Sequence, residues 1–142
     1  MKLIELDSSL VSFSKKLSPF FTRFSIFVVY FWFGILKVLE LSPATPLVHE
    51  LFLKTVAFIP FELFLMMFGI FECLIGIMIL IKGFERLAIL ATAIHLITTF
   101  MPLILIPSIW HGFLIPTMEA QYIIKNVLII ALLLNIGSRI KD

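Results

Sequence analysis

The chain of 142 residues has little of the charge that a soluble protein of its size carries on its surface. Only 14% of its residues are charged, whereas 61% are hydrophobic and the mean hydropathy is +1.16. An ordinary soluble domain is about 45–50% apolar and about 25% charged. A short chain also keeps a large surface for its volume. Lipid is therefore the expected solvent for most of this chain.

Cysteine is almost absent, because Cys73 is the only one. A single cysteine excludes an intrachain disulfide and a Cys-x-x-Cys redox or zinc motif, and with them the thiol-redox membrane enzymes. A net charge of +2 is too small and too scattered to indicate a nucleic-acid partner. The sequence also lacks a phosphate loop, a nucleophile–base arrangement and a set of metal ligands. We therefore expect no metal site, and the sequence gives no positive indication of an enzyme.

Long hydrophobic runs are what the sequence has in abundance. A membrane-spanning helix takes about 20 mainly apolar residues, and helices satisfy their own backbone groups in lipid. The expected spans are residues 20–41, 61–81, 87–106 and 120–137. Pro43, Pro60 and Pro107 lie at or just beyond their ends. The sequence predicts an all-α membrane protein with a four-helix transmembrane bundle at residues 20–142.

Basic residues lie mainly on one side of these spans. In the connections of the other side, Lys54 stands alone. The eight basic residues of the first side are Lys2, Lys15, Lys16, Arg23, Lys82, Arg86, Arg139 and Lys141. Because positive charge marks the cytoplasmic side of a membrane protein, we expect both termini in the cytoplasm.

Two helices are expected outside the spans. Residues 1–19 carry an apolar stripe at helical spacing, which predicts an amphipathic helix in the cytoplasmic interface or, alternatively, a docking helix for a partner protein. Thr45-Pro46 has the form of a helix start, so residues 46–58 are expected to form a short helix across the outer surface. Trp110 fits the aromatic belt at the outer boundary.

Ionisable residues inside spans are costly and tend to mark function. Glu72 falls near the midplane, and Gly69 and Gly76 on its helical face let a neighbouring helix approach. Side chains lean toward the N-terminus of their own helix, so Lys37 and Glu72 lean toward each other. We predict a Lys37–Glu72 ion pair. This pair has two alternative roles: it forms part of a binding site, or it only holds two helices in register.

Four further polar residues are candidates. His95 lies near the middle of the third span with threonines on its face. A histidine in such a position is more often a hydrogen-bonded interior residue than a ligand. Tyr30 lies two helical turns below Lys37. Lys125, with Asn126 beside it, starts the fourth span and is expected either to extend toward the outer boundary or to pair with one of three acidic residues, Glu40, Glu62 or Glu119.

Three short motifs resemble those of DoxX-like membrane proteins, especially their YkgB-like branch. They are Gly34-Ile35-Leu36-Lys37, Phe71-Glu72-Cys73-Leu74-Ile75-Gly76 and Gln121-Tyr122-Ile123-Ile124-Lys125-Asn126. The resemblance implies a four-helix bundle in the bacterial inner membrane, associated with quinone-linked oxidation or oxidative stress. It carries a polar pattern onto Lys37, Glu72 and Lys125, and none onto His95.

Three functions compete at this stage. The first is a non-catalytic accessory subunit of a quinone-linked redox system, in which Lys37, Glu72 and Tyr30 would bind a quinone. The second is a proton-coupled transporter or channel using Glu72 and His95, which would require a homo-oligomer. The third is a structural or assembly protein. The first ranks slightly above the third, with lipid and other membrane or redox subunits as partners.

Overall fold

A computed structural model describes residues 2–140 of the chain, with side chains from residue 7 onward, and most of these residues are helical. Lys141, one of the basic residues expected in the cytoplasm, lies outside the described residues. The elements in chain order are α1 (Lys2–Val38), α2 (Thr45–Thr55), α3 (Phe61–Leu80), α4 (Glu85–Phe100), α5 (Pro102–Leu105), a 3-10 turn η1 (Pro107–Ile109), β1 (Trp110–Gly112), β2 (Ile115–Pro116), α6 (Met118–Lys125) and α7 (Val127–Gly137).

Four helical segments in the described residues are long and apolar enough to cross a membrane, which confirms the expected number of spans and indicates a multi-pass membrane protein; the first segment begins earlier and ends earlier than the expected residues 20–41. They are Asp7–Val38, Phe61–Leu80, Glu85–Leu105 and Met118–Gly137. The third joins α4 to α5 at Met101, and the fourth joins α6 to α7 at Asn126. These two joints were not predicted.

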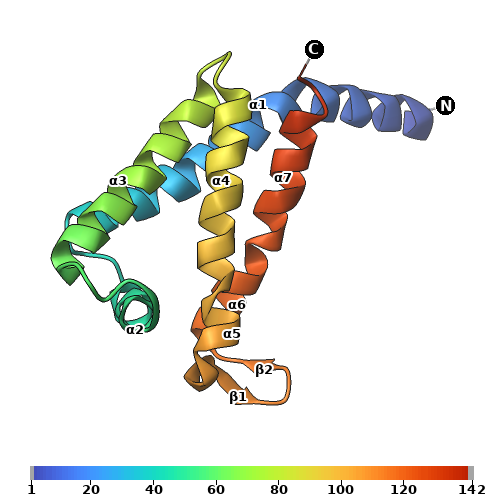
Figure 1. Ribbon diagram of the computed structural model, residues 1–142. Helices are drawn as coiled ribbons and strands as arrows, with labels where there is room; N and C mark the ends of the chain where they lie inside the picture. The colour runs from blue at the N-terminus through green and yellow to red at the C-terminus, as the bar shows by residue number, and fades with distance from the viewer. Residues whose placement is uncertain (1, 141–142) are drawn as a thin grey trace.

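Helices α1 and α3 pack side by side, and α4 and α7 complete the group (Figure 1). Their common core consists of aliphatic side chains and Tyr30, and its fully buried members include Ile26 of α1, Ile75 and Ile79 of α3 and Ala88 of α4. Small residues bring α1 and α3 into backbone contact. A β-carbon on Gly76 would lie only 3.0 Å from the backbone nitrogen of Phe31. Such approaches are typical of helix packing in lipid.

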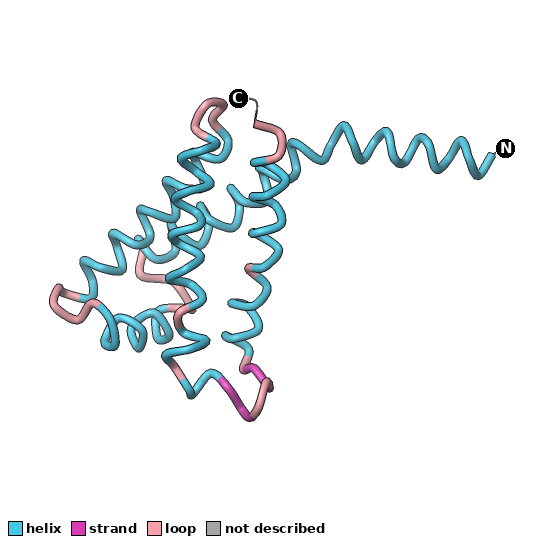
Figure 2. Tube along the Cα trace, turned by 45° about the vertical axis from the view of Figure 1, so that its right-hand side comes forward, coloured by secondary structure: helices cyan, strands magenta, loops and turns pink. Residues whose placement is uncertain are grey.

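The N-terminal segment differs from the expectation of a separate helix at residues 1–19. The structure has one continuous helix from Lys2 to Val38, with Pro19 inside it. Proline removes one backbone donor, and here the helix continues through it. Figure 2 shows the N-terminal part of α1 projecting away from the other helices, near the end where α7 finishes. Its side chains from Asp7 to Lys16 are exposed.

The long connections hold one expected helix and one unexpected hairpin. Helix α2 begins at Thr45, where the Thr45-Pro46 pair predicted a start. The all-α expectation is wrong between α5 and α6, where β1 and β2 form an antiparallel pair, with Trp110 opposite Pro116. The Trp110 indole also donates a hydrogen bond to the carbonyl oxygen of Leu103 at 3.0 Å. Short loop pairings of this kind leave no periodic pattern in a sequence.

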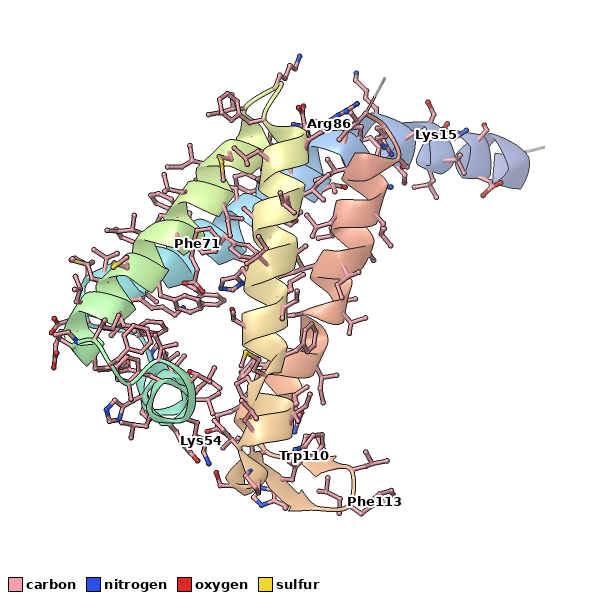
Figure 3. All side chains as sticks on the ribbon, viewed as in Figure 1. Lys15, Lys54, Phe71, Arg86, Trp110 and Phe113 are labelled. Atoms are coloured by element: carbon pink, nitrogen blue, oxygen red, sulfur yellow. The ribbon has the colours of Figure 1, made fainter. Side chains whose placement is uncertain are left out.

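The two ends of the molecule carry different side chains. Figure 3 shows Lys15 and Arg86 at one end, and Lys54, Trp110 and Phe113 at the other. At the first end, the Arg23 guanidinium lies 2.9 Å from a carboxylate oxygen of Glu85, and it also donates to the carbonyl oxygen of Ile79. This contact joins α1 to the last turn of α3 and the start of α4.

Candidate functional site

Glu72 lies at the centre of a buried polar network between three helices. One of its carboxylate oxygens, Oε2, accepts a hydrogen bond from Lys37 Nζ of α1 at 2.6 Å. The other, Oε1, lies 2.8 Å from His95 Nε2 of α4. The exposed fractions are 6% for Lys37, 5% for Glu72 and 6% for His95. Three ionisable groups from three spans therefore share one buried position.

The predicted Lys37–Glu72 ion pair is present in the structure. Lys37 lies in the last turn of α1, and its ammonium also reaches the carbonyl oxygen of Phe33 at 3.4 Å. Glu72 lies on the buried face of α3 together with Gly69 and Gly76. The pair therefore has the geometry that the lean of the two side chains predicted.

His95 also contacts Tyr30, so the network reaches α1 at a second residue besides Lys37. The hydroxyl of Tyr30 lies 3.1 Å from Nδ1 of His95, and Tyr30 is 3% exposed. Because the ionised carboxylate of Glu72 only accepts hydrogen bonds, we assign the ring proton to Nε2. In the neutral tautomer with its proton on Nε2, Nδ1 is the acceptor for the Tyr30 hydroxyl.

Threonine hydroxyls lie beside the histidine. The Thr99 hydroxyl donates to the carbonyl oxygen of His95 at 2.9 Å and lies 3.2 Å from Nδ1. The Thr98 hydroxyl donates to the same carbonyl oxygen at 2.7 Å. Thr99 is therefore a second group within hydrogen-bonding reach of Nδ1, beside the Tyr30 hydroxyl.

Aromatic rings enclose the imidazole. The Phe68 ring is stacked on His95 with centroids 5.1 Å apart and an interplanar angle of 18°. The Tyr30 ring meets it edge-on at 5.0 Å, and Phe71 lies at 6.3 Å. Lys37 Nζ lies 5.6 Å from the centroid of Phe68. In Figure 3, Phe71 marks the stretch of α3 that carries the site, next to α4.

Lys125 and Asn126 do not join this network, although the family resemblance carried a polar pattern onto Lys37, Glu72 and Lys125. Lys125 is exposed, with its ammonium 5.0 Å from the centroid of the Tyr122 ring, and within residues 2–140 it forms no ion pair. The buried face of α6 carries Ala120 and Ile123, so a residue two positions after Ile123 points to the opposite side. Asn126 is half-buried at the junction of α6 and α7.

Sequence reasoning found Lys37, Glu72 and His95 but missed the ring of Phe68 and the bond between Tyr30 and His95. The usable signal was the helical spacing of aromatic residues beside Glu72 on α3, namely Phe64, Phe68 and Phe71. It is a weak signal in a chain with 16 phenylalanines.

In the described part of the chain, no three histidine, cysteine or acidic side chains are grouped as metal ligands. Comparison of the chain with protein-family models, with curated proteins and with solved structures finds no match.

Proposed function

We propose that this chain is a DoxX-like protein of the bacterial inner membrane that binds a quinone at its buried network, as a non-catalytic accessory subunit of a quinone-linked redox or oxidative-stress system. In this proposal both termini lie in the cytoplasm, and the N-terminal part of α1 lies in the cytoplasmic interface. The projection of that segment, with Lys15 at the same end as Arg86, supports this orientation (Figure 3).

One observation carries the proposal, namely the unbroken series of hydrogen-bonding groups from Lys37 through Glu72 and His95 to Tyr30. A quinone head group needs donors for its carbonyl oxygens and a group that exchanges protons, both in apolar surroundings. Lys37 supplies a charged donor, and Glu72 and His95 supply proton exchange. The rings of Phe68 and Phe71 supply flat apolar walls.

A purely structural role explains the network less well. A buried ion pair is weak support for stability, because apolar residues of similar volume hold two helices equally well or better. The glycine contacts between α1 and α3 already provide close packing without a charged pair. Three ionisable groups from three helices, joined by hydrogen bonds, are more than is needed to hold two helices in register.

The proposal is tested by the thermal midpoint of the purified protein in detergent, with and without a fully substituted benzoquinone that carries a short alkyl tail. We expect the quinone to raise the midpoint of the native protein and of Lys125→Gln. The second protein loses an exposed lysine outside the network and is the matched control. Glu72→Gln, which keeps the shape but not the charge, should lose the shift. Equal shifts in all three proteins, or no shift in any, would contradict the proposal.

The 2.8 Å contact between His95 and Glu72 favours a second candidate, proton-coupled transport. Its test is proton flux into liposomes, which must fall in Glu72→Gln and persist in Lys125→Gln. Flux that is the same in both variants would exclude this candidate.

A further inference from the structure

We propose that Phe68 is the gate of this site: its ring fills the place where the planar ring of a ligand stacks on His95, and it moves aside on binding. This inference rests on the proposed function and names where, and against which groups, the ligand lies. It also narrows the ligand class to a single conjugated ring that carries carbonyl or hydroxyl oxygens.

The contacts of Phe68 are those that a bound ring would make. Its face lies against the imidazole of His95 at 5.1 Å and nearly parallel to it. The Lys37 ammonium lies 5.6 Å from its centroid. A phenyl ring in this position accepts no ordinary hydrogen bond from the ammonium, whereas a ring with oxygen substituents accepts one. Replacing the Phe68 ring by such a ligand would keep the stack and add a charge-assisted hydrogen bond.

Phe68 lies on α3 on the path along which this helix separates from α4. From their connecting loop, α3 and α4 diverge toward α2 (Figures 1 and 2). Rings of α3 and α2 follow each other along this direction, with Phe68 stacked on Phe64 at 5.7 Å and Phe64 5.1 Å from Phe52. Phe68 and Phe64 are half-buried, in contrast to the buried network behind them. A ring that is only half-buried can change rotamer rapidly.

The four members of the network are buried, with exposed fractions of 3% for Tyr30, 5% for Glu72 and 6% for both Lys37 and His95. A β-carbon on Gly69 would lie 2.9 Å from the β-carbon of Lys37, so the helices are closely packed there. Phe68 is therefore a half-buried ring in contact with both His95 and Lys37 of the buried group.

The test compares Phe68→Ala with Phe64→Ala, which removes the same side chain one helical turn away without touching His95. Binding of the short-tailed benzoquinone is measured by titration, and the ring nitrogens of His95 are followed by ¹⁵N NMR. A closed gate lowers the apparent affinity by the fraction of molecules that are open. If the gate is open in about one molecule in ten, Phe68→Ala should bind about tenfold more tightly than the native protein. Phe64→Ala removes only the ring stacked on Phe68 and should gain much less affinity than Phe68→Ala.

The outcomes separate the gate from the proposed function. If the native protein binds quinone, Glu72→Gln does not, and Phe68→Ala binds no better than Phe64→Ala, the gate is wrong and the proposed function stands. If Phe68→Ala alone binds and the His95 nitrogen signals move, the gate is supported and quinone binding by the native protein is refuted. Absence of binding in every variant overturns both.

Two further variants keep the gate testable if Phe68→Ala does not fold. Phe68→Leu keeps most of the apolar volume but cannot stack, so it should also bind more tightly than the native protein. Phe68→Trp fills the place with a larger ring and should bind more weakly. The reverse order of these two affinities would overturn the gate.

Discussion

Gly34 of α1 and Gly69 of α3 are in backbone contact: a β-carbon on either glycine would lie 2.7 Å from the carbonyl oxygen of the other. Lys37 and Glu72 each follow one of these glycines by three residues. Because side chains lean toward the N-terminus of their helix, both lean back toward the glycine contact from opposite directions. An axial gap of about 9 Å, at 1.5 Å per residue, is closed in this way to the 2.6 Å of the ion pair.

A methyl group at this contact should force α1 and α3 apart. We expect Gly34→Ala to lower the free energy of unfolding by about 1–3 kcal/mol, the usual cost of overpacking, and to weaken quinone binding together with stability. Gly137→Ala is the control, because its added carbon would meet only the end of Ile89 at 3.7 Å. Reversible unfolding in detergent measures the stability of the two variants, and a quinone titration measures their binding. Equal stability of the two variants would show that the close contact is unimportant.

The ion pair should behave as a coupled pair in a double-mutant cycle. Glu72→Leu leaves the buried Lys37 ammonium without its carboxylate, so we expect a loss of about 3–5 kcal/mol. The double variant Lys37→Met/Glu72→Leu should recover much of this loss, because apolar residues often replace a buried pair at little cost. If the two single losses add in the double variant, the pair contributes no coupling. If the double variant folds and still binds quinone, the network serves packing alone.

His95 should keep its neutral tautomer only while a hydroxyl donates to Nδ1. In Tyr30→Phe we expect a modest loss of stability, at the low end of the 1–3 kcal/mol for an unsatisfied buried group, because the Thr99 hydroxyl lies 3.2 Å from the same nitrogen. Tyr30→Phe/Thr99→Val should lose more than the sum of the two single variants. ¹⁵N NMR of the ring nitrogens reports the tautomer directly. Additive losses would mean that Thr99 does not replace Tyr30.

The proposed orientation has a direct chemical test. Cys73→Ala gives a cysteine-free chain, into which Lys15→Cys or Lys54→Cys introduces one thiol at either end of the molecule. A membrane-impermeant maleimide added outside bacterial spheroplasts should label Lys54→Cys and should label Lys15→Cys only after the membrane is opened. The opposite pattern would reverse the topology.

The spans were predictable because lipid imposes a simple rule on sequence: long apolar runs become helices. Lys37 and Glu72 were predictable because charge inside such runs is rare and the lean of side chains is fixed by the helix. The hairpin at Trp110 and the joint at Asn126 follow from local backbone geometry, which carries no periodic signal. Both were missed.

The position of His95 shows the limit of reasoning from depth alone. Its depth was estimated correctly, but its contacts with Glu72 and Tyr30 depend on the rotation of α4 about its axis. Tertiary packing sets that rotation, and the threonines beside His95 mark a polar face of α4 without identifying the helices that it meets. The alternatives left open for Lys125 depended on packing in the same way: α6 leaves it exposed, and the described residues hold no ion pair with Glu40, Glu62 or Glu119.

Native mass spectrometry of the gently extracted protein tests the central claim most directly. The native chain and Lys125→Gln should each carry a noncovalent adduct with the mass of a quinone, which Glu72→Gln lacks. The same spectra report bound partner subunits and the number of chains. A native chain that carries no such adduct, or a Glu72→Gln chain that carries it equally, would contradict the assignment of the Lys37–Glu72–His95–Tyr30 network as a quinone site.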